Sequence, residues 1–187
     1  MPAAVPARVS ERVIDDRRRL GIDAHDECWA GEWHLVNPPK SWHVELNADV
    51  FLVLAPLAHA RGLRAVGDAS GLFAAPDDWR VPDQTYARPE DRRDEGFVSA
   101  ELVVEIRSPG DDTYRKLPFY AGRGVAEVLV VDEARRVALY RLDGAGTLVP
   151  VRPRPDGPVR SDVLGVTFAT ADGPRLRIAW EGGTAEV

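Results

Sequence analysis

The chain has 187 residues, of which 44% are hydrophobic and 29% charged, and its formal net charge at pH 7 is -6. This length and composition indicate one globular domain with a substantial core. No apolar stretch approaches the roughly 20 residues that span a bilayer, and residues 1–8 lack the pattern of a secretory signal, so we expect a cytoplasmic protein without membrane contact. The acidic charge argues against tight non-specific DNA binding and leaves only local or metal-bridged contacts with nucleic acid.

Cysteine and lysine are both scarce. Cys28 is the only cysteine, which excludes an intrachain disulfide and a zinc site built from several cysteines. Of the 24 basic residues, only Lys40 and Lys116 are lysines. Lysine presents a compact ammonium that can reach a single oxygen, whereas arginine presents a planar fork, and this difference matters mainly in active sites. Each lysine is therefore either a chance occurrence or a residue needed as lysine.

The first part of the chain predicts two helices separated by short strands. Residues 10–20 form the first helix, and residues 27–36 form a pair of short strands with a turn between them. A helix of about 20 residues starts near Ser41, because apolar residues recur there at helical spacing. These apolar positions are Trp42, Leu46, Val50, Val53 and Leu57.

The middle of the chain predicts strands and a charged loop. Residues 63–66 and 71–74 have the pattern of two strands around a turn at residues 67–70, and residues 81–87 that of a third strand. The run at residues 88–95 is mixed in charge, which favours a surface loop over a phosphate-binding patch.

The clearest strand covers residues 97–107, where apolar side chains alternate between two faces. A helix over residues 113–121, a core strand over residues 126–131 and a hairpin strand over residues 137–142 follow. Further on, prolines break the chain into short strands, which suggest an antiparallel extension. The last two of these cover residues 163–169 and 176–180. This order of helices and strands predicts an α/β sandwich.

Two acidic residues stand out because of their settings. Asp83 follows Pro82 at the start of a predicted strand, and Glu105 lies inside an otherwise apolar strand. If these strands are neighbours, two carboxylates on one face at about 4 Å repel by roughly 4 kcal/mol unless a cation or a shared proton intervenes. Magnesium suits such hard oxygen ligands and often bridges to a substrate phosphate. The alternatives are a turn role for Asp83 and a buried salt bridge of Glu105 to Arg107 or Arg115.

Further side chains can support such a site. Lys116 is expected on the helix after the strand, from where it can reach the carboxylates and stabilise developing phosphate charge. Asp112 and Tyr120, four residues before and after it, would share its helix face and orient it. Arg107 can hold phosphate but cannot act as a base. Pro118 must make the helix begin late or bend, because proline costs about 3 kcal/mol inside a helix.

Several of these residues belong to a wider pattern. The matching positions are Gly31, Glu32, His43, Pro82, Asp83, residues 101–109, Asp112, Lys116, Tyr120, residues 124–127 and Asp132. Over residues 26–142 the chain resembles the bacterial Uma-two family of restriction endonucleases. That family is similar to the PD-(D/E)xK nuclease superfamily, with the active lysine moved from the strand to the following helix.

The resemblance implies an α/β (α+β) fold of the restriction-endonuclease type, in which helices flank a mixed central sheet and extra antiparallel strands follow at the C-terminus. We expect a single nuclease-like domain. Residues 1–25 would form an N-terminal helical extension, residues 26–142 the core and residues 143–187 a C-terminal β extension.

The resemblance also implies a site and a partner. Asp83 and Glu105 would bind magnesium or manganese, Lys116 would be the catalytic cation, and the protein would form a homodimer. Either Glu32 or Glu45 would match the upstream acid that often adds to the site in the superfamily.

Three functions remain open from the sequence. The leading hypothesis is a magnesium-dependent endonuclease that cleaves DNA with Asp83, Glu105 and Lys116. The second is a catalytically silent module of the same fold that binds nucleic acid or protein. The third is a structural dimer in which a buried pair of Glu105 and Lys116 fixes the core. The histidines show no metal-binding spacing.

Overall fold

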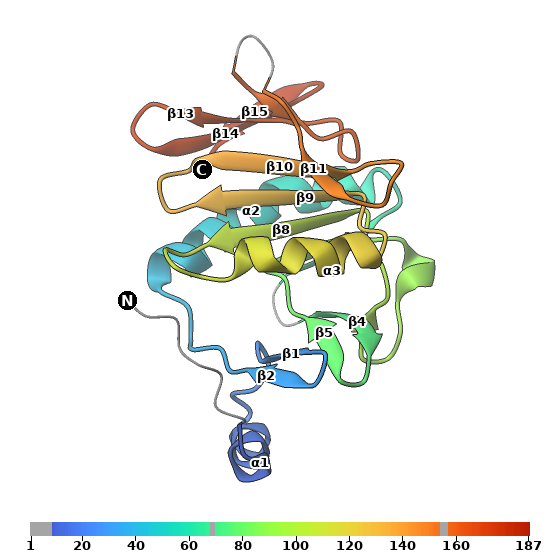
Figure 1. Ribbon diagram of the computed structural model, residues 1–187. Coiled ribbons are helices and arrows are strands. Elements are labelled where there is room, and N and C mark those ends of the chain that lie inside the picture. Colours follow the sequence, from blue (N-terminus) through green and yellow to red (C-terminus); the bar gives the residue numbers. More distant parts are fainter. Residues whose placement is uncertain (1–8, 68–69, 154–156) are drawn as a thin grey trace.

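The computed structural model describes residues 9–67, 70–153 and 157–187, which contain three α-helices and three β-sheets (Figure 1). The helices are α1 (Glu11–Leu20), α2 (Ser41–His59) and α3 (Leu117–Gly122), with the 3-10 helices η1 (Pro89–Asp91) and η2 (Thr113–Lys116). The strands are β1 (Glu27–Trp29), β2 (Glu32–His34), β3 (Arg64–Gly67), β4 (Gly71–Ala75), β5 (Asp78–Arg80), β6 (Gln84–Ala87), β7 (Gly96–Phe97), β8 (Leu102–Arg107), β9 (Glu127–Asp132), β10 (Val137–Leu142), β11 (Leu148–Pro150), β12 (Val159–Arg160), β13 (Thr167–Ala171), β14 (Arg175–Trp180) and β15 (Gly183–Glu186). In these described ranges, no helix is both long enough and apolar enough to cross a membrane.

A mixed six-stranded sheet forms the centre of the molecule, in the order β11-β10-β9-β8-β6-β3. Its strands β8 and β9 run parallel, while the other neighbours are antiparallel. A parallel pair needs a crossover connection, and η2 and α3 provide it. The C-terminal strands form a separate antiparallel sheet, β12-β13-β14-β15. The predicted α+β class, with a mixed central sheet and extra C-terminal strands, is therefore confirmed.

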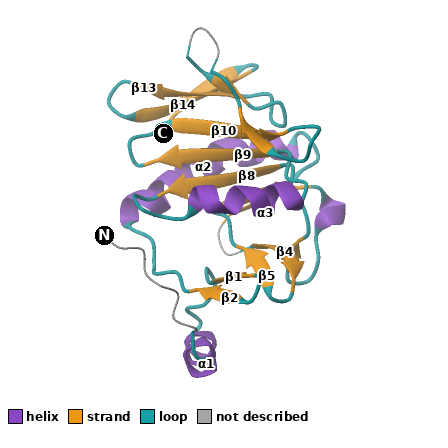
Figure 2. Ribbon diagram, viewed as in Figure 1, coloured by secondary structure: helices purple, strands orange, loops and turns teal. Residues whose placement is uncertain are grey.

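The two faces of the central sheet bury different partners, and Figure 2 shows α2 and α3 on opposite sides of it. Leu102, Val104 and Ile106 of β8 pack with α2 and with the C-terminal sheet. Val103, on the other face of the same strand, packs in a second cluster with Tyr120 of α3. The alternation predicted for this strand is confirmed. The face toward α3 also carries Glu105.

A second sheet, β2-β1-β5-β4-β7, lies beside the central sheet and will be called the small sheet (Figure 1). Helix α1 contacts it through two arginines, of which Arg18 lies over the ring of Trp33 and Arg17 makes hydrogen bonds. The guanidinium of Arg17 donates hydrogen bonds of 2.7 Å to Oδ1 of Asp26 and of 2.9 Å to the carbonyl oxygen of Val36. The carboxylate of Asp26 is buried, so this contact fixes the start of the β1–β2 hairpin.

Three predicted boundaries were wrong because the chain passes repeatedly between the central and small sheets. Residues 63–66 and 71–74 are not partners, since β3 joins the central sheet and β4 the small sheet; residues 68–69 of the turn expected between them lie outside the described residues. Residues 81–87 form a strand only from Gln84 onward, because β5 ends at Arg80 in the small sheet. Residues 97–107 are split in the same way between β7 and β8.

The helix predicted over residues 113–121 is composite. It begins as the 3-10 helix η2 and continues as α3, with Pro118 in the first turn of the α-helix. Proline is tolerated there because the first turn leaves its backbone N–H groups without helical partners. In the C-terminal sheet, β13 begins only at Thr167 and β15 was not predicted.

We expect Leu54→Ala to lower the free energy of unfolding by about 2–5 kcal/mol, because it opens a cavity between α2 and the central sheet. Leu54 is fully buried, whereas Leu52 in the same helix is 71% exposed. The matched control Leu52→Ala should change stability by no more than about 0.5 kcal/mol. Urea unfolding measures both variants. Equal effects would show that α2 does not pack through the face described above.

Candidate active site

The antiparallel register of β6 and β8 places Asp83, the residue before β6, beside Glu105. Two hydrogen bonds hold the Asp83 carboxylate. Its Oδ2 accepts a 2.6 Å bond from the backbone N–H of Ile106, and its Oδ1 lies 2.8 Å from Nε2 of His43 in α2. The predicted adjacency of the two strands is confirmed, although the roles of the two acids stay predictions.

His43 fixes the direction of the Asp83 carboxylate. Burial lowers the pKa of His43, but the hydrogen bond and the charge of Asp83 outweigh this effect, so the pKa is raised overall. An ionised carboxylate can only accept hydrogen bonds, so Nε2 of His43 is the donor in this contact.

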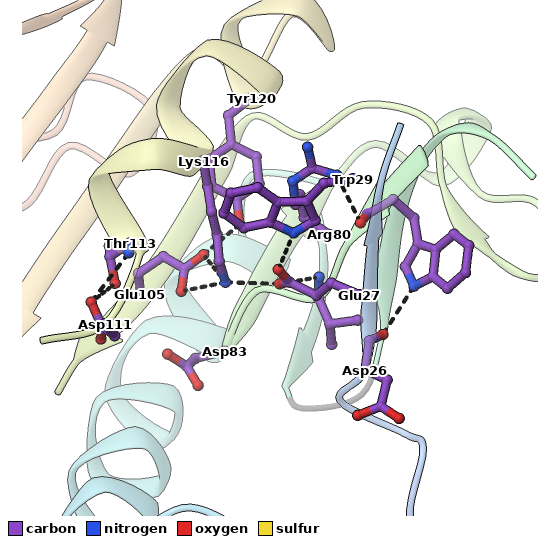
Figure 3. Close-up of polar contacts among 12 residues, drawn as sticks. Asp26, Glu27, Trp29, Arg80, Asp83, Glu105, Asp111, Thr113, Lys116 and Tyr120 are labelled. Carbon is purple, nitrogen blue, oxygen red and sulfur yellow. Dashed lines mark hydrogen bonds and ion pairs between the residues drawn. The ribbon is translucent and has the colours of Figure 1, made fainter. Parts of the chain in front are cut away.

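Glu105 is buried in spite of its charge, with 4% of its surface exposed. Its carboxylate accepts a hydrogen bond from the hydroxyl of Tyr120, and its two oxygens lie 3.3 and 3.5 Å from Nζ of Lys116 (Figure 3). Burial raises the pKa of Glu105 to about 7; the charge of Lys116 opposes this shift, while those of Asp83 and Glu27 add to it. The charge of Lys116 alone therefore does not keep the pKa of Glu105 at its usual value.

Lys116 bridges two buried carboxylates. Its Nζ lies 2.8 Å from Oε1 of Glu27 and 3.3 Å from Oε1 of Glu105. Burial lowers the pKa of Lys116, but the charges of Glu105 and Glu27 outweigh it and hold the pKa above its usual value. Lys116 therefore remains an ammonium and acts as a fixed positive charge. It is the last residue of η2, so Pro118 lies beyond it and does not limit its reach.

Glu27 is a site residue that the sequence did not reveal. It begins β1, is 3% exposed, and accepts hydrogen bonds of 2.7 Å from Nε1 of Trp29 and 2.9 Å from the backbone N–H of Val81. Together with Lys116 these donors leave its carboxylate well satisfied. The only sequence signal was an acid at the start of a short apolar strand, and three residues are too few to define a face.

A stack of side chains holds the small sheet against α3 and orients Glu27. The guanidinium carbon of Arg80 lies 4.4 Å from the ring centroid of Trp29 and 4.2 Å from that of Phe119. The ring of His34 also stacks on Trp29, at 4.1 Å between centroids. Buried cation–π contacts contribute up to about 2 kcal/mol each. Because Trp29 also donates to Glu27, the stack sets the direction of that carboxylate.

The four residues described above, Glu27, Asp83, Glu105 and Lys116, line one cavity of about 360 Å³, together with Asp111 and Asp112. His25, His34 and His43 line it as well. Burial lowers the pKa of His34, and its buried Nε2 has no hydrogen-bond partner among the residues described. These histidines come from separate segments, so their spacing in the sequence could not show that they meet.

The structure does not bring the two proposed upstream acids into the cavity. Glu32 and Glu45 are exposed and are not among its lining residues. Glu27, which also precedes Asp83 in the chain, does line the cavity. Of the other proposed supporting residues, Tyr120 is buried and contacts Glu105 directly.

The arginines considered as partners of Glu105 pair elsewhere. Arg115 lies 3.1 Å from Oδ1 of Asp112, and Arg107 lies 3.8 Å from Oδ1 of Asp111. The alternative of a Glu105–arginine salt bridge is therefore wrong. Asp112 lines the cavity but precedes η2, and it pairs with Arg115 rather than with the lysine of the site.

The carboxylate oxygens of the site suit a magnesium ion whose coordination shell a substrate phosphate would complete. In the part of the chain that the structure describes, no group of three or more His, Cys, Asp or Glu side chains is arranged to hold a metal ion. Magnesium, however, usually takes only one or two carboxylates, with waters and substrate phosphate in its other positions. Asp83 and Glu105 are two such carboxylates side by side. With Glu27 these carboxylates outnumber the ammonium of Lys116 that contacts two of them, so a divalent cation would meet an excess of negative charge there.

We expect Lys116→Met to lower the free energy of unfolding by about 3–5 kcal/mol, because two buried carboxylates lose their cation. The matched control is Lys40→Met at the other lysine, which is exposed and should change stability by no more than about 0.5 kcal/mol. Chemical unfolding followed by circular dichroism measures both. If the two variants are equally stable, the ammonium of Lys116 does not hold these segments together.

Comparisons with known proteins identify a similar fold and a family. A crystal structure titled as a putative nuclease belonging to DUF820, from Anabaena variabilis, has the same fold; its TM-score is 0.59 at 18% identity, over 74% of this chain and 82% of that one. No curated protein matches the chain. A family model named Uma2 and described as "Putative restriction endonuclease" matches residues 21–171. Because this match covers most of the chain, the protein belongs to the Uma2 family.

Proposed function

We propose that this protein is a magnesium-dependent DNA endonuclease that hydrolyses phosphodiester bonds. The observation that carries the proposal is the meeting of Asp83, Glu105 and Lys116 in one cavity, with the lysine 3.3 Å from Glu105. Adjacent strand carboxylates and a lysine from the following helix are the arrangement that the PD-(D/E)xK resemblance implies. Membership of the Uma2 family supports a nuclease, while the metal, the DNA substrate and the residue roles are proposed.

Each side chain has a distinct part in this mechanism. Asp83 and Glu105 would hold magnesium, or manganese in its place, and the bound metal would supply Lewis-acid activation of a phosphodiester. Lys116, which stays protonated, would attract the phosphate and stabilise the negative charge that develops on it. Tyr120 fixes the Glu105 carboxylate, and Glu27 fixes the ammonium of Lys116.

The charge of the chain limits how it would bind DNA. A net charge of -6 provides no general attraction for phosphates, so affinity must come from local basic side chains or through the metal. The homodimer and the cytoplasmic location expected from the sequence stay predictions.

A structural role for the same charges is the second candidate, because Lys116 is paired with both Glu27 and Glu105. Buried ion pairs often fail to recover their desolvation cost, so such a network can persist for reasons other than stability. Glu27 changes how this alternative is tested. Replacing only Glu105 and Lys116 would leave Glu27 buried without its cation. A silent binding module or a structural dimer also predicts no DNA cleavage by the wild-type protein.

We expect Asp83→Asn and Glu105→Gln each to lower the rate of DNA cleavage at least about 100-fold, because each removes a metal ligand from the reacting site. The matched controls Glu32→Gln and Glu45→Gln change exposed acids outside the cavity and should cleave at the wild-type rate. Gel assays on labelled DNA, with magnesium, with manganese and with EDTA, measure these rates. Wild-type protein that cleaves no DNA under any of these metals would defeat the proposal, as would cleavage that survives EDTA.

We expect Glu27→Gln to lower kcat about 10- to 100-fold with a smaller effect on KM, because Lys116 loses its closest anionic partner. Trp29 and Val81 donate to different oxygens of Glu27, and the amide keeps only one of them as an acceptor, so one of these hydrogen bonds is lost as well. A melting curve checks that the variant is folded. Glu27→Asp keeps the charge and should retain more activity than Glu27→Gln. Equal activity of both variants and the wild type would limit Glu27 to a role in folding.

A further inference from the structure

Arg107, the last residue of β8, carries a charge that the protein itself matches poorly. Its side chain is 29% exposed, and its buried Nε has no hydrogen-bond partner within the described residues. Oδ1 of Asp111 lies 3.8 Å from that nitrogen, which is too far for a hydrogen bond. The Asp111 carboxylate instead accepts bonds of 2.6 Å from the backbone N–H of Ser108 and 2.7 Å from the hydroxyl of Thr113. The guanidinium of Arg107 makes no hydrogen bond within the described residues, so its N–H groups beyond the buried Nε remain donors for an oxygen from outside the chain.

Tyr114 covers this guanidinium and is itself open to solvent. The guanidinium carbon of Arg107 lies 5.1 Å from the centroid of the Tyr114 ring. That ring meets Tyr140 edge-on at 6.1 Å and remains 44% exposed. An exposed aromatic ring beside a cation is the combination that binds nucleic-acid strands, because the ring stacks on a base while the cation contacts the backbone.

Arg107 and Tyr114 each lie two residues from a proposed catalytic residue, on the same two elements, β8 and η2. Arg107 follows Glu105 by two residues on β8, which is about 7 Å along a strand. Tyr114 precedes Lys116 by two residues on η2. A strand bound with one phosphate in the active-site cavity would therefore present its neighbouring nucleotide to Arg107 and Tyr114.

Two hollows adjoin Arg107 on this side of the molecule. The first measures about 280 Å³ and is lined by Arg107, Tyr114, Asp132 and Arg136 among others; the second measures about 410 Å³ and shares the two arginines and Asp132. Asp132 is already engaged, since its Oδ2 lies 2.7 Å from Arg136. Glu133 also lines the second hollow but is exposed, so solvent and salt screen its charge.

We propose that Arg107 and Tyr114 form a nucleotide subsite next to the active-site cavity, in which Arg107 binds a backbone phosphate and Tyr114 stacks on the adjoining base. The subsite rests on the proposed function, because it holds another part of the same DNA strand. Arginine offers the planar, two-donor geometry that suits a phosphate. Stacking requires an unpaired base, so the subsite favours single-stranded or locally opened DNA.

Binding of fluorescein-labelled DNA, single-stranded and duplex, tests the subsite when measured in EDTA over a series of salt concentrations. Without a divalent metal no metal-dependent cleavage occurs, so binding is separated from catalysis. Arg107→Ala should weaken binding about tenfold and reduce the slope of log affinity against log salt by about 1, because one phosphate contact is lost. Arg107→Lys keeps the charge and should fall between the wild type and Arg107→Ala. Tyr114→Ala should weaken binding of single strands at least about fivefold, and Tyr114→Phe should not.

The matched control is Arg175→Ala, which removes an exposed arginine in the C-terminal sheet whose partner is Glu186. Melting curves confirm that each variant is folded. Wild-type protein that binds no DNA, an unchanged salt slope for Arg107→Ala, or an equal loss for Arg175→Ala would overturn the subsite. DNA binding that depends on Arg107 without any cleavage in magnesium would keep the subsite and refute the nuclease. If Arg107→Ala changes neither DNA binding nor cleavage in magnesium, the nuclease stands and the subsite is refuted.

Discussion

The ammonium of Lys116, held between the carboxylates of Glu27 and Glu105, is the interaction on which the rest of the site depends. It joins three separate parts of the chain, namely β1 of the small sheet, β8 of the central sheet and η2 between β8 and β9. Opposite charges at about 4 Å attract by roughly 4 kcal/mol at an effective dielectric of 20. The same carboxylates would repel each other if the lysine were absent. One charge therefore connects the two sheets and offsets the repulsion between two carboxylates that line the cavity.

The site residues that could be predicted from the sequence are those whose type is unusual for their surroundings or for the chain. Glu105 is a charge in an apolar strand, and Lys116 is one of two lysines among 24 basic residues. Asp83 needed a further assumption, that its strand neighbours β8, and the register confirms it. Glu27 carries no such mark, because a strand of three residues has no visible alternation.

The incorrect boundaries and the missed residues have a common cause. Between β3 and β8 the chain passes from one sheet to the other at β3–β4, β5–β6, β6–β7 and β7–β8. Two of these passages, β5–β6 and β7–β8, fall within segments that were predicted as continuous strands, because apolar residues are buried on both sides of the crossing. The same passages bring Glu27, His34 and Asp83 to one cavity from distant positions. The local periodicity of apolar residues indicates that a residue is buried, but it does not indicate which of the two sheets buries it.

The scarcity of lysine gains a physical explanation at position 116. The side chain is 14% exposed and its nitrogen contacts two carboxylates at 2.8 and 3.3 Å. An ammonium has three donors, and these contacts with any incoming phosphate would use them. A guanidinium has five donors in a rigid plane, so in this enclosed position it would leave some of them unpaired, at a cost of about 1–3 kcal/mol or more each. Arg107 shows the opposite case, because at the end of β8 its side chain lines a hollow and its guanidinium makes no hydrogen bond within the described residues, so its N–H groups beyond the buried Nε remain available to a ligand. Lysine therefore suits the enclosed position 116, where every donor needs a partner in the site. Arginine suits position 107, where donors that the protein leaves unpaired can reach a ligand.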